Sequence, residues 1–349
     1  MGFRALGQED LGGNEMRQPE FLKKGEKIAM VAPSFGVTTE PYLTRYTASR
    51  KNLEKEGFVI EEGPCVHLEE GVAASASAQR RAEEVMNAFR GDASLVLSVG
   101  GGETMCEILP FLDFDEIASL PPKWFMGFSD NTNLCFPLAT LAGTMSIYGP
   151  CGPQFYARPF RGPEKDSLSL LRGKRHLEGY PKFTKTRSNP DHPLWRYRLT
   201  QEKIIEPHGY EAPVSGTLLG GCLDCLLGFC GTRFDAVKEW NDSHPEGTIW
   251  FLEACDLSPL GIRRGLFQLR EAGWFENAKM FLIGRPLCRD AEIFGVNKRN
   301  AVLDILSPLG APILLDVDLG HIAPSLPIKV GARATVSLKE GNIVYDYAE

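Results

Sequence analysis

Short apolar runs alternate with helical segments through the first half of the chain, and this alternation limits the fold more than any other feature. The runs at 27–33, 94–99 and 124–128 are continuously apolar, as strands covered on both faces are. Between the first two, Ser77 is placed to cap a helix, and we expect Gly91 to end it in a left-handed conformation. Strands that alternate with helices predict an α/β fold with a mainly parallel sheet.

The second half returns to strand and helix signals after a stretch with no clear period. Residues 248–252, 279–284 and 312–317 are predicted strands, and 334–347 is predicted to form a β-hairpin. We therefore expect a polar tail at 1–24, an N-terminal α/β domain at 25–180, a linker or long loop at 181–212 and a C-terminal domain at 213–349.

Composition and charge indicate which kinds of molecule the protein can bind. The 349 residues carry 38 basic and 45 acidic side chains, a net charge of −7, which disfavours a nucleic-acid polymer and favours a small polar substrate. No apolar stretch approaches the roughly 20 residues that span a bilayer, so we expect no membrane partner. The N-terminal stretch does not have the pattern of a secretory signal, so we expect a cytoplasmic protein whose nine cysteines are reduced.

Two strand ends carry features that suit acyl chemistry. Ser129 follows the strand at 124–128 and precedes a helix, so its hydroxyl is expected on a sharp turn, with the backbone N–H of Asp130 at the helix start. The run Gly100-Gly101-Gly102 ends another strand and lets the backbone approach a ligand. The alternatives are a simple helix cap at Ser129 or Asp130 and a tight turn at the glycines.

Two further strand ends carry a carboxylate and an imidazole. Glu253 closes the strand at 248–252, and His321 is the one histidine of six that directly follows a convincing strand. Histidine supplies a base near neutral pH, and a carboxylate can orient it. We predict that Glu253 orients His321 and that His321 deprotonates Ser129, which requires three remote residues to meet.

These motifs resemble the LD-carboxypeptidase family, which also contains the microcin C immunity peptidases. The resemblance runs from about residue 27 to the C-terminus. It is carried by Gly127-Phe128-Ser129-Asp130 with Asn131-Thr132-Asn133-Leu134, by Leu252-Glu253, and by Gly320-His321-(x)2-Pro324-(x)2-Pro327-(x)3-Gly331.

The resemblance implies a serine peptidase with a Ser-Glu-His triad, no metal and no cofactor. It implies that Ser129 is the nucleophile, Glu253 the orienting acid and His321 the base, with oxyanion donors at Asp130 and at Gly101 or Gly102. It also implies a Rossmann-like N-terminal domain, a smaller, β-rich, barrel-like C-terminal domain, and a homodimer.

Two substrates follow from the two branches of the family. One branch removes the terminal D-alanine of murein tetrapeptides during cell-wall recycling, and the other cleaves an aminoacyl or peptidyl nucleotide whose base stacks on an aromatic side chain. Trp195, in the predicted long loop, and Tyr148 fit the second branch. Cys222 stands where many members have an asparagine after Gly-Gly, so its contact with substrate is an open expectation.

Other interpretations stay open. Cys151, Cys222 or Cys255 with His321 would make a thiol hydrolase, although the apolar neighbours of Cys222-x-x-Cys225 favour a core position over a metal or redox site. A homologue that binds its ligand without turnover is the non-enzymatic alternative. The cation for a substrate carboxylate is sought among four residues: Arg263, Arg264, Arg285 and Lys329.

Overall fold

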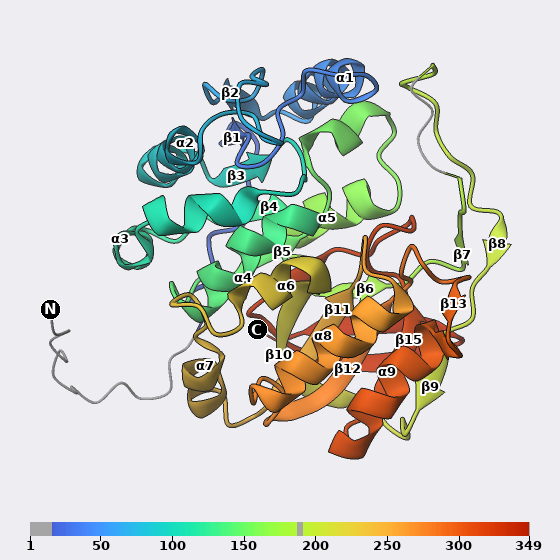
Figure 1. Cartoon of the computed structure of the whole chain (residues 1–349). Helices are drawn as coiled ribbons and strands as arrows, with labels where there is room; N and C mark the ends of the chain where they lie inside the picture. The colour runs from blue at the N-terminus through green and yellow to red at the C-terminus, as the bar shows by residue number, and fades with distance from the viewer. Residues whose placement is uncertain (1–15, 187–190, 349) are drawn as a thin grey trace, which may run out of the picture.

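The computed structural model describes residues 16–186 and 191–348, and within them two β-sheets lie one above the other (Figure 1). The first sheet has the strand order β16-β5-β4-β3-β1-β2, in which every pairing is parallel except that of β16. Its strands are β1 (Lys27–Val31), β2 (Val59–Glu62), β3 (Leu95–Ser98), β4 (Trp124–Gly127), β5 (Ser146–Tyr148) and β16 (Ile328–Val330). The predicted α/β class and parallel sheet are confirmed.

Helices connect the strands of this sheet. They are α1 (Tyr42–Lys55), α2 (Ala78–Arg90), α3 (Phe114–Ser119), α4 (Thr132–Thr140) and α5 (Pro163–Leu171), with 3-10 segments η1 (Met105–Phe111), η2 (Ser129–Asn131) and η3 (Gly152–Tyr156). Ser77 caps α2 as predicted, since its side chain accepts the N–H of Arg80. The left-handed end predicted at Gly91 is wrong: its φ of −65° is ordinary, and its N–H bonds to the Asn87 carbonyl.

The second sheet is mixed, with the order β6-β18-β17-β10-β11-β12-β15-β9. Its strands are β6 (His176–Glu178), β9 (Glu206–His208), β10 (Val214–Cys222), β11 (Thr248–Glu253), β12 (Ala278–Gly284), β15 (Ile313–Val317), β17 (Arg333–Lys339) and β18 (Asn342–Tyr347). Four of them, β10, β11, β12 and β15, run parallel. The C-terminal half is thus rich in β-structure, and its described residues show no closed barrel.

Helices accompany the second sheet as well. They are α6 (Leu223–Phe229), α7 (Val237–Ser243), α8 (Pro259–Glu271) and α9 (Lys298–Leu306), with the 3-10 segment η4 (Ser307–Leu309). Figure 1 shows α8 and α9 across the face of the sheet that is turned to the viewer, and α4 and α6 between the two halves. A small hairpin of β13 (Glu292–Ile293) and β14 (Val296–Asn297) stands at the sheet's end.

The two sheets exchange strands. β16, from the C-terminal part of the chain, pairs with β5 of the first sheet, whereas β6, from the first 180 residues, pairs with β18 of the second. Each half of the fold therefore depends on a segment from the other half of the sequence. The domain boundaries expected at residues 180 and 213 stay a proposal.

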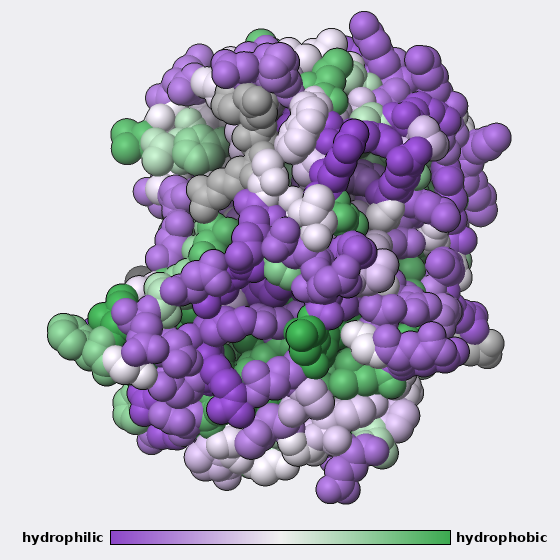
Figure 2. Space-filling model, turned by 90° about the vertical axis from the view of Figure 1, so that its right-hand side faces the viewer, coloured by the Kyte–Doolittle hydropathy of each residue, from purple (hydrophilic) through white to green (hydrophobic). Residues whose placement is uncertain are grey.

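The expected long loop starts and ends at a short hairpin. β7 (Lys182–Phe183) pairs with β8 (Gln201–Glu202), and the segment between them, which we call the arm (184–186 and 191–200 as described), runs along the right-hand edge of Figure 1. The face on that side is mostly hydrophilic, with small hydrophobic groups dispersed over it (Figure 2).

The predicted polar tail is described in part. Residues 1–15 lie outside the described residues, but 16–24 pack on the first sheet: the Arg17 guanidinium donates to the Leu120 carbonyl at 2.9 Å, and Leu22 is buried. The nearer part of the tail is therefore a piece of the fold. Across the described residues, helices long and apolar enough to cross a bilayer are absent.

A buried ionic cluster joins the foot of the arm to the loop that follows β15. The Asp318 carboxylate accepts from Lys203 Nζ at 2.6 Å and from the Arg285 guanidinium at 2.9 Å, and the three side chains are at most 3% exposed. The same carboxylate accepts the backbone N–H of Tyr180. Asp318 thus compensates two buried cations.

Replacing Asp318 should destabilise the protein strongly. Asp318→Asn leaves Lys203 and Arg285 buried without a counter-charge, so we expect the free energy of unfolding to fall by about 3–5 kcal/mol in urea titrations. The control is Glu202→Gln, which breaks the exposed pair with Lys182, whose side chains are 44% and 75% exposed. That change should cost about 0–1 kcal/mol, and equal losses in the two variants would contradict this account.

Candidate active site

Ser129 stands on a strained turn at the carboxyl end of β4. Its φ is +63°, in the left-handed region that non-glycine residues rarely adopt, and η2 and α4 begin at this point. A Cβ on Gly127 would lie 2.6 Å from Asn131 Cγ, so the turn requires a glycine there. The strand, turn and helix predicted around Ser129 are present, and the turn holds its hydroxyl outward from the sheet.

Ser129, His321 and Glu253 form one hydrogen-bonded chain. His321 Nε2 lies 2.8 Å from Ser129 Oγ, and His321 Nδ1 lies 2.8 Å from Glu253 Oε2. The three side chains come from the end of β4, the end of β11 and the loop after β15. Residues separated by up to 192 positions are thus within proton-transfer reach.

Glu253 is fully buried, and glycines make room for it. Its side chain is 0% exposed. Gly320 has a φ of +96°, and a Cβ there would lie 2.6 Å from Glu253 Oε2; a Cβ on Gly284 would lie 3.0 Å from Glu253 Cβ. The glycine before His321 therefore lets the imidazole approach the carboxylate closely.

Opposing effects act on the pKa of His321. Burial has the largest single effect and lowers this pKa, but the charge of Glu253 and the hydrogen bonds with Cys255 and Glu253 together outweigh burial, so the pKa is raised. The ring also lies 5.3 Å from that of Phe128. The site therefore stabilises the imidazolium that forms when His321 accepts a proton.

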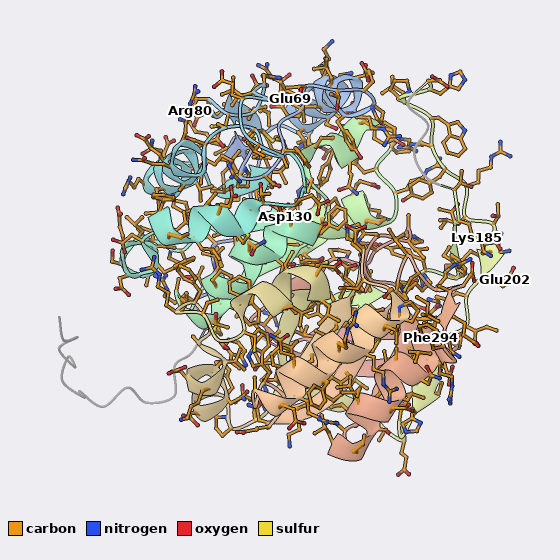
Figure 3. The ribbon with its side chains drawn as sticks, in the orientation of Figure 1. Glu69, Arg80, Asp130, Lys185, Glu202 and Phe294 are labelled. Atoms are coloured by element: carbon orange, nitrogen blue, oxygen red, sulfur yellow. The ribbon has the colours of Figure 1, made fainter. Side chains whose placement is uncertain are left out.

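Asp130 ties the serine turn to neighbouring loops through its side chain. Its carboxylate accepts from Ser34 Oγ at 2.5 Å, from the Met105 N–H at 2.9 Å and from the Asn133 amide at 2.9 Å. Burial raises its pKa, and these hydrogen bonds oppose that effect. Figure 3 shows Asp130 near the centre of the molecule, between the two halves.

The glycine turn after β3 lies against the serine. A Cβ on Gly101 would lie 3.5 Å from Ser129 Oγ, and Gly102 has a φ of +159°. The Asn131 amide donates to the Gly100 carbonyl at 2.9 Å and to the Phe128 carbonyl at 2.9 Å, which joins the two turns. The turns thus border a common space at the hydroxyl of Ser129.

A cavity of about 1490 Å³ opens in front of these turns. Ser129, His321 and the three glycines line one part of it, and the arm lines another. The space is larger than a single small ligand requires, so an extended substrate fits.

The arm is fastened across the cavity to the N-terminal half. Arg45 Nε donates to the Pro193 carbonyl at 2.6 Å, and the Tyr156 hydroxyl donates to the Trp195 carbonyl at 2.9 Å. Trp195 itself is 40% exposed and lines the cavity. The expectation that Trp195 contacts substrate is compatible with this position.

The four cations that were expected to bind a substrate carboxylate are not among the described residues that line the cavity: Arg263, Arg264, Arg285 and Lys329. Arg285 is occupied by Asp318, and Arg263 on α8 donates to Asp304 at 2.6 Å. Six other cations line the cavity, and the sequence pattern did not single them out: Arg45, Arg161, Lys185, Arg196, Arg198 and Arg289.

Tyr148 and Cys222 need correction as substrate contacts. Each is 1% exposed and absent from the described lining of the cavity. The Tyr148 hydroxyl instead bonds to Glu253, and the Cys222 N–H donates to Thr132 Oγ1 at 2.9 Å, which joins β10 to the start of α4. Both residues lie behind the reacting groups because their strands run beneath the serine turn.

The thiols are all free, and two of them line the cavity. Cys222 is buried away from it, Cys151 is a buried residue of its wall, and Cys255 lines it beside His321. His321 Nε2 nevertheless bonds to Ser129 Oγ. In 16–186 and 191–348, groups of three or more His, Cys, Asp or Glu side chains arranged to hold a metal ion are absent.

Comparison with known proteins assigns both halves of the chain. The family models of the LD-carboxypeptidase N-terminal and C-terminal domains match residues 28–149 and 215–336. The chain is 23% identical to the microcin C7 self-immunity protein MccF of Escherichia coli, over 92% of this chain and 93% of that protein. It is 24% identical to a probable murein peptide carboxypeptidase of Bacillus subtilis, over 94% of each.

A solved structure shares the fold. MccF in complex with aspartyl sulfamoyl adenosine superposes with a TM-score of 0.78 at 21% identity, over 94% of this chain and 98% of that chain. The similarity covers both sheets and the segment that connects them.

Proposed function

Because the chain belongs to the LD-carboxypeptidase family of serine-type carboxypeptidases, we propose that Ser129, Glu253 and His321 are a catalytic triad that hydrolyses an amide bond of a small peptide-like substrate. The observation that carries the proposal is the unbroken chain of two 2.8 Å contacts from Ser129 Oγ through the imidazole to a buried carboxylate.

The reaction is an acyl transfer in two steps. Ser129 Oγ attacks the scissile carbonyl carbon while His321 Nε2 takes the hydroxyl proton, and the resulting imidazolium passes that proton to the leaving amine. Backbone N–H groups of Asp130 and of Gly101 or Gly102 hold the oxyanion. Water, deprotonated by His321, then cleaves the acyl-enzyme and restores Ser129.

The first candidate substrate is a murein tetrapeptide, from which the enzyme would release the terminal D-amino acid. The B. subtilis relative is named for murein peptides, and a carboxypeptidase needs a cation for the terminal carboxylate. Of the six cations in the described lining of the cavity, Lys185 and Arg289 pair with Asp290, and Arg45 and Arg196 donate to backbone carbonyls. Arg161 and Arg198 are the two that are left for a substrate carboxylate. They replace the four cations that the sequence suggested.

A second candidate is an aminoacyl or peptidyl nucleotide. The observation that favours it is the group of aromatic side chains at the arm end of the cavity, where Trp195 lines the wall with Tyr156 and Tyr197. Such side chains can stack a base, and the nearby arginines can hold an anionic linkage. We also propose that the protein is a cytoplasmic homodimer. The family resemblance implies the homodimer, and the argument for reduced thiols implies the cytoplasm.

The nucleophile is tested with a fluorophosphonate probe. The wild type should be labelled at Ser129, and Ser129→Ala should lose labelling and about 10⁶-fold in kcat, as for other triads. Ser215→Ala, an exposed site on β10, is the matched control and should keep both. If Cys255→Ala abolishes hydrolysis while Ser129→Ala keeps it, the enzyme is a thiol hydrolase and the proposal fails.

The orienting role of Glu253 has a signature in the pH profile. His321 must be neutral to take a proton, so the rate rises as the pH passes through its pKa. Because Glu253 raises that pKa, Glu253→Gln should move the rising limb to lower pH and reduce the plateau by roughly 10³- to 10⁴-fold. Because the pKa of His321 is raised to about 11, the measurement is kcat/KM from pH 5 to 12. An unchanged limb, or one moved to higher pH, would count against the assignment.

The substrate is chosen by a side-by-side assay of a murein tetrapeptide and an aminoacyl sulfamoyl adenosine. If the nucleotide is the substrate, Trp195→Ala should raise its KM about 10- to 100-fold, whereas Trp195→Phe should have a small effect. Leu194→Ala, at an exposed neighbour outside the described cavity lining, is the control. Turnover of the tetrapeptide alone, with a KM that Trp195→Ala leaves unaltered, would exclude the nucleotide.

A further inference from the structure

Tyr148 lies directly behind the proposed triad, at the end of β5. Its hydroxyl is 2.6 Å from Glu253 Oε1 and 2.9 Å from the backbone nitrogen of Ser129. The side chain is 1% exposed, and its ring packs 5.6 Å from that of Phe251. The hydroxyl therefore contacts two parts of the site at once while remaining out of reach of substrate.

The chemistry of its partners determines where the hydroxyl proton points. A backbone N–H can only donate, so the Tyr148 oxygen accepts from Ser129, and its single proton is left for Glu253 Oε1. The other carboxylate oxygen, Oε2, faces His321 Nδ1. Both oxygens of the buried carboxylate are thus held, one from each side.

We propose that Tyr148 is a positioning residue of this active site: its hydroxyl fixes Glu253 against the backbone of Ser129 and limits how strongly Glu253 attracts the proton of His321. The inference rests on the proposed triad. Tyr148 touches no reacting atom, so it acts through Glu253 and through the turn that presents Ser129.

The first consequence concerns the oxyanion. Since the Ser129 N–H is spent on Tyr148, it is unavailable to a substrate oxygen. The donors must therefore come from the next residue, Asp130, and from the glycine turn. The same bond holds the strained backbone of Ser129, with its φ of +63°, in the conformation that aims Oγ at His321.

The second consequence concerns charge. A hydrogen bond to Oε1 stabilises the carboxylate and draws charge away from Oε2, so its removal should strengthen the attraction between Glu253 and protonated His321.

The groups that face the imidazole and can exchange a proton are Glu253, Ser129, Cys255 and, at longer range, Glu103. Burial holds the pKa of Tyr148 well above its usual range, so this donor stays protonated while His321 titrates.

The test compares Tyr148→Phe with the wild type by the rate of fluorophosphonate inactivation from pH 5 to 12, a range that includes the raised pKa of His321. We expect a plateau lower by about 10- to 100-fold and a rising limb displaced to higher pH, the direction opposite to that of Glu253→Gln. His321 imidazole NMR shifts, assigned by difference with His321→Gln, follow the same pKa without any reaction.

The matched control is Tyr347→Phe. That hydroxyl is also buried and also accepts a backbone N–H, but its partner is Lys329, at 3.2 Å, and not Ser129. It should leave the plateau and the limb unchanged. A Tyr148→Phe profile that matches the wild type, or equal changes in the two variants, would overturn the inference. Failure of the wild type to react at Ser129 would instead remove the proposed function.

A second variant keeps the shape of the side chain. Incorporating 3-fluorotyrosine at position 148 makes the hydroxyl a stronger donor, so the limb should move to lower pH than in the wild type. This result is accessible even if Tyr148→Phe fails to fold, which a thermal melt would show. A limb that stays in place, or moves to higher pH, would contradict the assigned role.

Discussion

The burial of one carboxylate, Glu253, organises this molecule. A charged side chain with no solvent exposure is stable only if each of its oxygens receives a donor, and here the donors come from different sheets. Tyr148 lies on β5 of the first sheet, while His321 lies on the loop that follows β15 of the second sheet. Satisfying Glu253 therefore requires the two sheets to meet in one register, and that register places His321 beside Ser129.

Strand exchange supplies the register. The loop that carries His321 begins at β15 in the second sheet and ends at β16 in the first, so it is clamped at both ends. In the first sheet, Tyr148 pairs with Gly127 on one side and with Ile328 on the other. The serine turn and the histidine loop thus extend from strands that flank the same residue. The distance between hydroxyl and imidazole follows from this pairing.

How far the sequence predicts the site depends on whether a signal is local. Ser129, Glu253 and His321 each follow an apolar run, and such residues at the ends of parallel strands gather on one edge. The position of Tyr148 depends instead on which strands neighbour β5, a long-range pairing that no local pattern encodes. The charge of Arg285 made it a candidate for binding substrate, but no local pattern shows that it is buried and paired with Asp318. Gly91 shows the same limit, since a glycine permits a left-handed conformation without requiring one.

The arm links the cavity wall at Trp195 to the loop that carries His321. Its first described residue, Thr184, donates its backbone N–H to the Ala323 carbonyl at 2.9 Å, two residues after His321. Beyond its other end, Lys203, which directly follows β8, pairs with Asp318, three residues before His321. The arm therefore cannot shift over the cavity without pulling on both sides of the histidine. Because its middle is fastened to the first half through Arg45 and Tyr156, a substrate that engages Trp195 bears on the same structure that holds the imidazole. Under the proposed function, recognition at the far end of the cavity and proton transfer at Ser129 would therefore depend on one continuous segment.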